Sequence, residues 1–99
     1  MNSIPKLHDA ILETITLLWE EGTVHLRLST GVNGTGIVIL SAIGVRDLIC
    51  PRLFPWGPSD SINEVKLDSI NDGQFLSVKM QSGDVLQITC REVSATAGS

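Results

Sequence analysis

The sequence predicts an all-β fold, a single small antiparallel sandwich or barrel-like meander of six to seven strands. Turn-forming residues recur at short intervals, and the runs between them are rich in Val, Ile, Leu and Thr, which favour strands. The turn signals are Glu21-Gly22, Asn33-Gly34, Asn71-Asp72-Gly73 and Ser82-Gly83. The chain has 99 residues, of which 42% are hydrophobic, so we expect one core and a single domain over residues 1–99.

The first hairpin is expected over about residues 14–29. If Glu21 and Gly22 form a two-residue loop, this turn fixes the register. One face then carries only apolar pairs, which are Trp19 with Val24, Leu17 with Leu26 and Ile15 with Leu28. The chain before the hairpin is expected to be extended from about residue 12, and its apolar spacing also suits one short helical turn over residues 6–10.

Residues 35–50 are expected to form a central strand followed by a shorter one. The run Ile37-Val38-Ile39-Leu40 is apolar at every position, which is typical of a strand covered on both faces. Gly44 is expected to end this strand, and residues 45–50 then form the shorter strand.

The second hairpin is expected to turn at Asn71-Asp72. Its inner pairs are Leu67 with Leu76 and Val65 with Val78, and an outer pair of opposite charge is Glu64 with Lys79. The same register sets Asn63 inward and opposite Met80, where its side chain would need a hydrogen-bond partner.

The third hairpin requires a three-residue loop or a bulge, because a two-residue loop at Ser82-Gly83 would mix apolar and polar residues on each face. A loop of Ser82-Gly83-Asp84 would use Gly83 for positive φ. The inner pairs would then be Met80 with Leu86, Val78 with Ile88 and Leu76 with Cys90. The last residues are small and polar, so we expect order over about residues 5–92 and a frayed tail over residues 93–99.

Composition narrows the range of partners and compartments. The formal net charge is −4, which disfavours contact with phosphate backbones, so we expect no nucleic acid partner. The N-terminus has no apolar run after a basic start, and the longest apolar run, residues 36–45, is too short to span a bilayer. These features predict a cytoplasmic protein that does not enter a membrane, with Cys50 and Cys90 reduced and buried.

Few residues suggest chemistry. Adjacent His8 and Asp9 resemble the His-Asp pairs of metal phosphohydrolases, but the one other histidine, His25, gives no metal-ligand spacing with His8. We therefore expect Asp9 to cap a turn and His8 to bond the backbone. No Gly-x-Ser-x-Gly elbow is present, and "GVNGTG" at residues 31–36 lacks the phosphate-binding lysine. The sequence thus predicts no catalytic residue, no metal and no cofactor, and favours a non-enzymatic protein.

The segment "FPWGPSDSIN" at residues 54–63 is the most unusual part of the chain. Its prolines fix φ and remove backbone donors, so it is expected to be a stiff surface connection. Trp56 is either a plug over the open end of the sheet or an exposed anchor for a partner. The candidate binding residues are His8, Asp9, Trp56, Ser59, Ser61 and Asn63.

Three segments carry a resemblance to known proteins: "LHDAILETITLLWEEGTVHLRL", "FPWGPSDSINEVKL" and "MQSGDVLQI". Together they resemble a family of small, uncharacterised bacterial proteins that is well represented in cyanobacteria, and this resemblance implies no particular activity. The His-Asp-Ala segment, followed by strands like "VIL" and "VRDL", is also similar to the start of some immunity proteins of bacterial toxin systems. That second resemblance implies a protein that binds and neutralises a partner protein.

The sequence favours a non-catalytic β protein that acts by binding another protein or by self-association, including a homodimer, because a small open sheet has exposed edges. One alternative is a barrel that holds a small apolar ligand, with Trp19 and Trp56 at its mouth. A second alternative is the immunity-type antagonist, and an enzyme that uses His8 and Asp9 is the third.

Overall fold

The computed structural model describes residues 7–30, 36–51 and 61–97, and in these ranges the chain forms eight β-strands and no helix. The strands are β1 (Ile11–Leu18), β2 (Thr23–Thr30), β3 (Gly36–Ile43), β4 (Asp47–Ile49), β5 (Ile62–Ile70), β6 (Gly73–Met80), β7 (Val85–Cys90) and β8 (Glu92–Ala97). The prediction of an all-β fold is confirmed, with one strand more than the upper limit expected.

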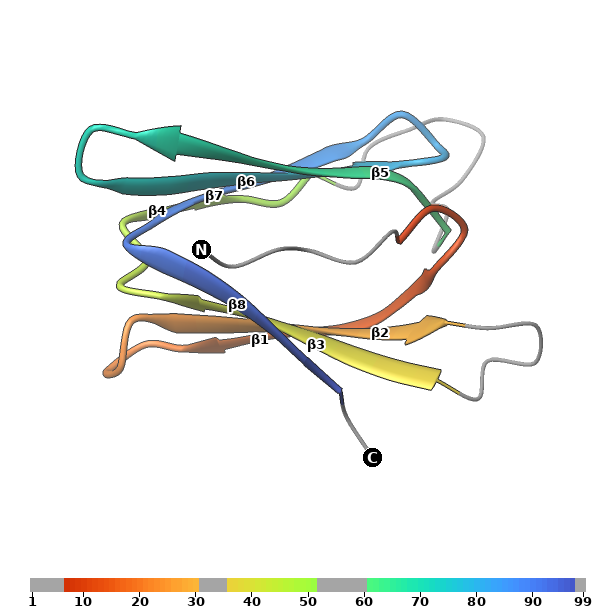
Figure 1. Ribbon diagram of the computed structural model, residues 1–99, viewed down its shortest axis with the longest axis horizontal. Helices are drawn as coiled ribbons and strands as arrows, with labels where there is room; N and C mark the ends of the chain where they lie inside the picture. The colour runs from red at the N-terminus through yellow and green to blue at the C-terminus, as the bar shows by residue number, and fades with distance from the viewer. Residues whose placement is uncertain (1–6, 31–35, 52–60, 98–99) are drawn as a thin grey trace.

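The strands form two antiparallel sheets of four strands each. Sheet A has the order β1-β2-β3-β8, and sheet B has the order β4-β7-β6-β5. Figure 1 shows the two sheets as two layers that face each other, so the architecture is a sandwich. The chain passes from sheet B to sheet A between β7 and β8, where only Arg91 separates the two strands.

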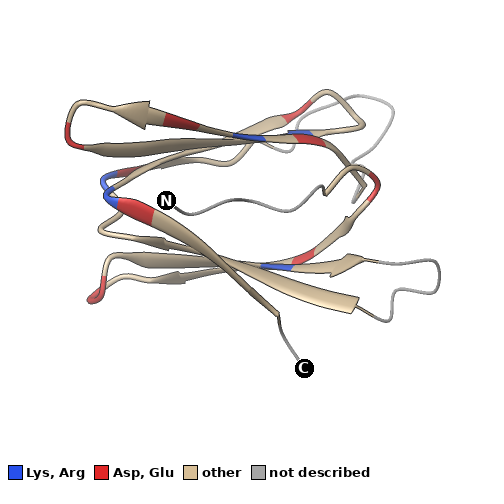
Figure 2. Ribbon diagram, in the orientation of Figure 1, with Lys and Arg blue, Asp and Glu red and all other residues tan. Residues whose placement is uncertain are grey.

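The core lies between the two layers and is made by alternate residues of the strands. Its ten largest fully buried side chains are Leu26, Leu28, Leu40, Ile62, Leu76, Ile88, Val24, Val78, Val93 and Cys90. Burial of a Val, Leu or Ile side chain contributes roughly 1.5–3 kcal/mol, so this alternation is the main cause of the two-layer arrangement. Figure 2 shows the charged residues in the turns and along the strands.

The first hairpin has a different register from the one the sequence predicts. Leu17 pairs with Val24 and Ile15 pairs with Leu26, so the loop contains four residues, from Trp19 to Gly22. Gly22 donates its N–H to the Trp19 carbonyl at 3.2 Å and has a φ of 62°. The expected pairing of Trp19 with Val24 is therefore wrong, because a turn that ends on a left-handed glycine places Trp19 in the loop.

A β-bulge between Leu12 and Thr14 completes this change of register. Beyond the bulge, Leu12 pairs with Leu28, the residue that the sequence analysis paired with Ile15. The extra residue is Glu13, whose carboxylate accepts a hydrogen bond from Arg27 Nε at 3.0 Å.

The second hairpin has the predicted register over most of its length. Asn71 and Asp72 form a two-residue loop, and the pairs Leu67–Leu76, Val65–Val78 and Glu64–Lys79 are all present. The prediction for Asn63 is wrong, because a second bulge, between Ile62 and Glu64, makes Ile62 the partner of Met80. Ile62 takes the fully buried position, and Asn63 is half-buried.

The third hairpin has the predicted odd-length loop, and Gly83 has a φ of 103°. The loop consists of residues 81–83, because the Met80 N–H donates to the Asp84 carbonyl at 2.8 Å. The observed pairs are Val78 with Leu86, Leu76 with Ile88 and Gln74 with Cys90, a shift of two residues from the expected register. A shift by an even number keeps every side chain on its predicted face, so Cys90 still points into the core.

Three further expectations need correction. β3 is central in its sheet, but Ile37 and Ile39 on its outer face are only half-buried, so the strand is not covered on both sides. Residues 92–97 form β8 rather than a frayed tail, because Val93 is buried and pairs with Ala42. Residues 7–10, the described part of the expected helical turn, form a β-turn closed by the Ala10 N–H and the Leu7 carbonyl at 3.0 Å.

Candidate functional site

The turn at residues 7–10 presents two of the candidate residues to solvent. Leu7 and Ala10 are buried, and Asp9 has a φ of 67°, a left-handed conformation that Asp tolerates better than most residues. The buried side chains of Leu7 and Ala10 anchor both ends of the turn in the core. His8 and Asp9 are consequently exposed at the point where the chain enters β1.

Backbone hydrogen bonds join this turn to the beginning of β5. The Asp9 N–H donates to the Ile62 carbonyl, and the Ile62 N–H donates to the Ala10 carbonyl, both at 2.8 Å. Ile11 and Ser61 form an isolated antiparallel bridge beside them. On its other side, the Ser61 carbonyl accepts the Gln81 N–H at 2.9 Å. The two sheets are therefore linked at this end of the sandwich.

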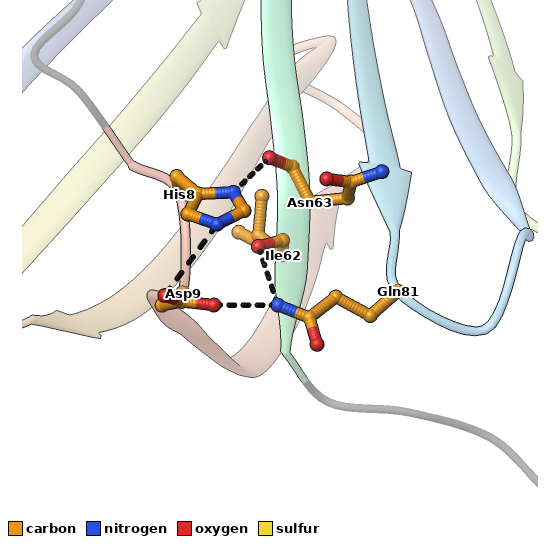
Figure 3. A network of polar contacts seen from close by, with 5 residues as sticks. All are labelled: His8, Asp9, Ile62, Asn63 and Gln81. Atoms are coloured by element: carbon orange, nitrogen blue, oxygen red, sulfur yellow. Dashed lines mark hydrogen bonds and ion pairs between the residues drawn. The ribbon is translucent and has the colours of Figure 1, made fainter.

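Side chains add a polar network, which we call the latch, made of His8, Asp9 and Gln81 with the carbonyls of Ile62 and Asn63 (Figure 3). His8 Nδ1 lies 2.6 Å from the Asn63 carbonyl oxygen, and a carbonyl only accepts, so Nδ1 carries the proton. His8 Nε2 lies 3.5 Å from Asp9 Oδ2.

Gln81 completes the latch from the third hairpin. Its Nε2 donates to Asp9 Oδ1 at 2.6 Å and approaches the Ile62 carbonyl at 3.4 Å. The sequence analysis did not select Gln81. A signal was available, since Gln81 directly precedes the polar loop expected at residues 82–84.

The contacts of the latch are those of a structural hydrogen-bond network between the turn, β5 and the third hairpin. His8 is oriented by the backbone carbonyl of Asn63, and Asp9 accepts a hydrogen bond from the Gln81 amide. Among the described residues, no group of three or more His, Cys, Asp and Glu side chains could hold a metal ion. Each of these exposed hydrogen bonds contributes on the order of 0.5–1.5 kcal/mol at most.

The structure brings together four of the predicted site residues, although in different ways. His8 and Asp9 contribute side chains, whereas Asn63 contributes its carbonyl and Ser61 its backbone groups. The expectation that His8 bonds the backbone is confirmed. Trp56 and Ser59 lie outside the described residues.

A second candidate site, missed by the sequence analysis, is the outer edge of β1 over residues 14–19, beside which no further strand lies among the described residues; we call it the β1 edge. Among the described residues, the exposed large hydrophobic side chains are Ile15 at 36%, Leu17 at 44%, Leu18 at 37%, Trp19 at 85%, Ile49 and Ile70. Four of these six side chains therefore lie within the five consecutive positions 15–19. The four-residue turn places Trp19 outside the strand, and the exposure of Ile15 and Leu17 depends on how far sheet B reaches, so neither could be read from alternation.

Neither face of the β1 edge carries a charged side chain. Ile15 and Leu17 pair with the buried Leu26 and Val24, so they point toward the inner face of sheet A. Their exposure shows that sheet B does not cover β1 at this point. Leu18 points to the outer face with Thr14 and Thr16. Residues 14–19 carry no charge, and Glu13 just before them is paired with Arg27.

The two cysteines differ in environment. Cys90 is fully buried, and burial raises the pKa of its thiol, which keeps it neutral and unreactive. Cys50 is exposed, so the expectation that both would be buried is wrong for Cys50. Neither forms a disulfide.

A comparison with models of known protein families gave no match, and neither did comparisons with curated proteins and with solved structures. In the part of the chain that the structure describes, no helix has the length and apolar character needed to cross a membrane.

Proposed function

We propose that this protein is a non-catalytic binding module that recognises another protein chain at the β1 edge. The observation that carries the proposal is the concentration of exposed apolar side chains on one edge strand, Ile15, Leu17 and Leu18, and on the first residue of the turn after it, Trp19. A hydrophobic edge strand without charges is a template for pairing with a further strand.

Strand addition uses two properties of such an edge. The outward N–H and C=O groups of β1 supply backbone hydrogen bonds, and alternate side chains supply specificity. Ile15 and Leu17 would contact one face of the incoming strand, and Leu18 the other. Trp19 at the end of the edge is an anchor of the residue type that most often dominates interface energies.

The latch supports this role by holding the edge in place. It joins the residues just before β1 to the beginning of β5, and the turn at residues 19–22 joins the other end of β1 to β2. A strand held at both ends loses less conformational freedom when a partner binds. The polar residues selected from the sequence would then position the binding edge, while the apolar residues beside them make the contact.

The proposal is tested by comparing proteins retained from a cell lysate by the unaltered chain and by two lysine variants. Leu17→Lys puts a charge in the centre of the β1 edge and should abolish retention of the bound protein. Ser69→Lys, at an exposed position of β5, is the control and should retain it. Equal retention by Leu17→Lys and the unaltered chain would show that the β1 edge is not the binding surface.

A further inference from the structure

We propose that the occupant of the β1 edge is a second copy of this chain, with the two β1 strands paired antiparallel about a twofold axis at Thr16. This inference rests on the proposed function, because it names the partner of the same edge. The product would be one continuous eight-stranded sheet in which the two β1 strands are the central pair.

Symmetry restricts how two β1 edges can meet. A twofold axis perpendicular to the sheet makes the pair antiparallel and keeps the inner faces of both copies on one side. Directly opposite residues of an antiparallel pair share a face. The axis must therefore pass between the two copies of one and the same residue. The regular part of β1 after the bulge is residues 14–18, and its midpoint is Thr16.

This register is self-complementary in its side chains. On the inner face, Ile15 of each copy lies opposite Leu17 of the other, which brings four exposed apolar side chains together. On the outer face, Thr16 meets its own counterpart, and Thr14 lies opposite Leu18. Cross-strand pairs of this kind contribute roughly 0.2–1 kcal/mol each, and none of these pairs opposes like charges.

Charge at the two ends of the strand also fits an antiparallel pair. The turn after β1 carries Glu20 and Glu21, and the bulge at the other end carries Glu13, whose charge is balanced by its ion pair with Arg27. Antiparallel pairing carries the acidic turn of one copy toward this neutral pair of the other. A parallel pairing would instead set the two acidic turns side by side.

The exposure of Ile15 and Leu17 indicates that there is room for the second copy. Both residues point to the inner side of sheet A, yet sheet B leaves 36% and 44% of them accessible. A strand added along β1 therefore meets open space on the inner side. On the outer side, Thr14, Thr16 and Leu18 are also exposed.

The size of the contact predicts a transient dimer. A standard stable interface buries about 800 Å² on each partner, whereas one short strand with its side chains and Trp19 buries less. We therefore expect a dissociation constant in the micromolar range, on the order of 10–100 μM. Sedimentation velocity from 1 μM to 1 mM should show a shift from monomer to dimer.

A single cysteine at the proposed axis tests the register. In a Cys50→Ser background, Thr16→Cys places two thiols at directly opposite positions, with Cα atoms about 4.5–5.5 Å apart, which is within disulfide range. Oxidised glutathione should then convert most of the protein to a covalent dimer. The matched control is Thr14→Cys on the same face, whose two copies would be about 13 Å apart and should remain monomeric.

Equal cross-linking of the two cysteine variants would overturn the register at Thr16. Sedimentation as a monomer up to 1 mM would overturn the second copy as partner. That failure is distinct from failure of the proposed function, because a β1 edge that binds a different protein would still lose lysate retention in Leu17→Lys. Thermal melting of both cysteine variants should match the background protein, since Thr14 and Thr16 are exposed.

Discussion

The β1 edge and the β5 edge, which is the outer edge of strand β5 in sheet B, both end a sheet, yet they differ in the charge of their side chains. On β5, the outward positions Glu64, Lys66 and Asp68 are exposed and alternate in charge, as Figure 2 shows. On β1, the corresponding positions are Thr14, Thr16 and Leu18. A strand added to β5 would have to desolvate three charges, whereas a strand added to β1 would desolvate none. We therefore expect edge residues, rather than sheet topology, to decide at which side of this sandwich a further strand can be added.

The inward positions of the two edges differ as well. Val65 and Leu67 of β5 are half-buried and pack against the core, whereas Ile15 and Leu17 of β1 remain exposed. The strands are joined at one end by the latch and by the bridge between Ile11 and Ser61. On these two edge strands, Ile62 beside the junction is the best buried side chain, and Leu17 and Ile70 toward the far ends are exposed. Burial along the two edges thus depends on distance from the latch.

The largest expected effect comes from truncating one inward residue on each edge. Ile62→Ala removes a fully buried side chain beside the latch and should lower the free energy of unfolding by about 3 kcal/mol. Ile15→Ala removes a side chain that is already 36% exposed and should cost less than about 1 kcal/mol in the monomer. Urea unfolding at 1 μM measures both values, and similar losses would contradict the difference in burial.

A second prediction concerns a variant in which the β5 edge resembles the β1 edge. The triple variant Glu64→Thr, Lys66→Thr, Asp68→Thr removes the charges while keeping β-forming residues at exposed positions. With two open edges, the chain should assemble beyond the dimer, and at 100 μM sedimentation should show trimers and larger species. Asp72→Thr changes the net charge by the same single unit, but in a turn, and should leave the dimer equilibrium unaltered. A triple variant that stops at dimers would show that the β5 charges do not protect that edge.

The comparison also shows what could be predicted from the sequence. Alternation settles which face a side chain occupies, so Leu76, Val78, Ile88 and Cys90 were assigned correctly even where the register was wrong by two residues. Alternation says nothing about an even shift, and a bulge inserts a residue without a local signal at Glu13 or Asn63. The four-residue turn after β1 is likewise invisible to alternation, which is why Trp19 was expected to pair with Val24.

The latch was predicted in part for a related reason. His8 and Asp9 are adjacent in the sequence, so a shared local role could be inferred from the residues alone. Gln81 lies 72 positions from Asp9, and only the meeting of β5 with the turn at residues 7–10 brings them together. Long-range pairing of this kind cannot be read from the spacing of residues in one chain.

The smallest expected effect tests whether the latch holds the two edges together. Gln81→Ala removes the amide that donates to Asp9 Oδ1, an exposed hydrogen bond worth on the order of 0.5–1 kcal/mol. The loss should appear locally, as a roughly two- to fivefold faster hydrogen exchange of the Asp9 and Ile62 amides, whose N–H groups join the turn to β5. Exchange at Val78 in the centre of sheet B should be unaltered. The control is Gln87→Ala on the outer face of β7, which should leave the Asp9 and Ile62 amides unchanged. If Gln81→Ala also leaves them unchanged, the backbone bonds alone fasten β1 to β5, and the open and protected edges are independent of the polar residues between them.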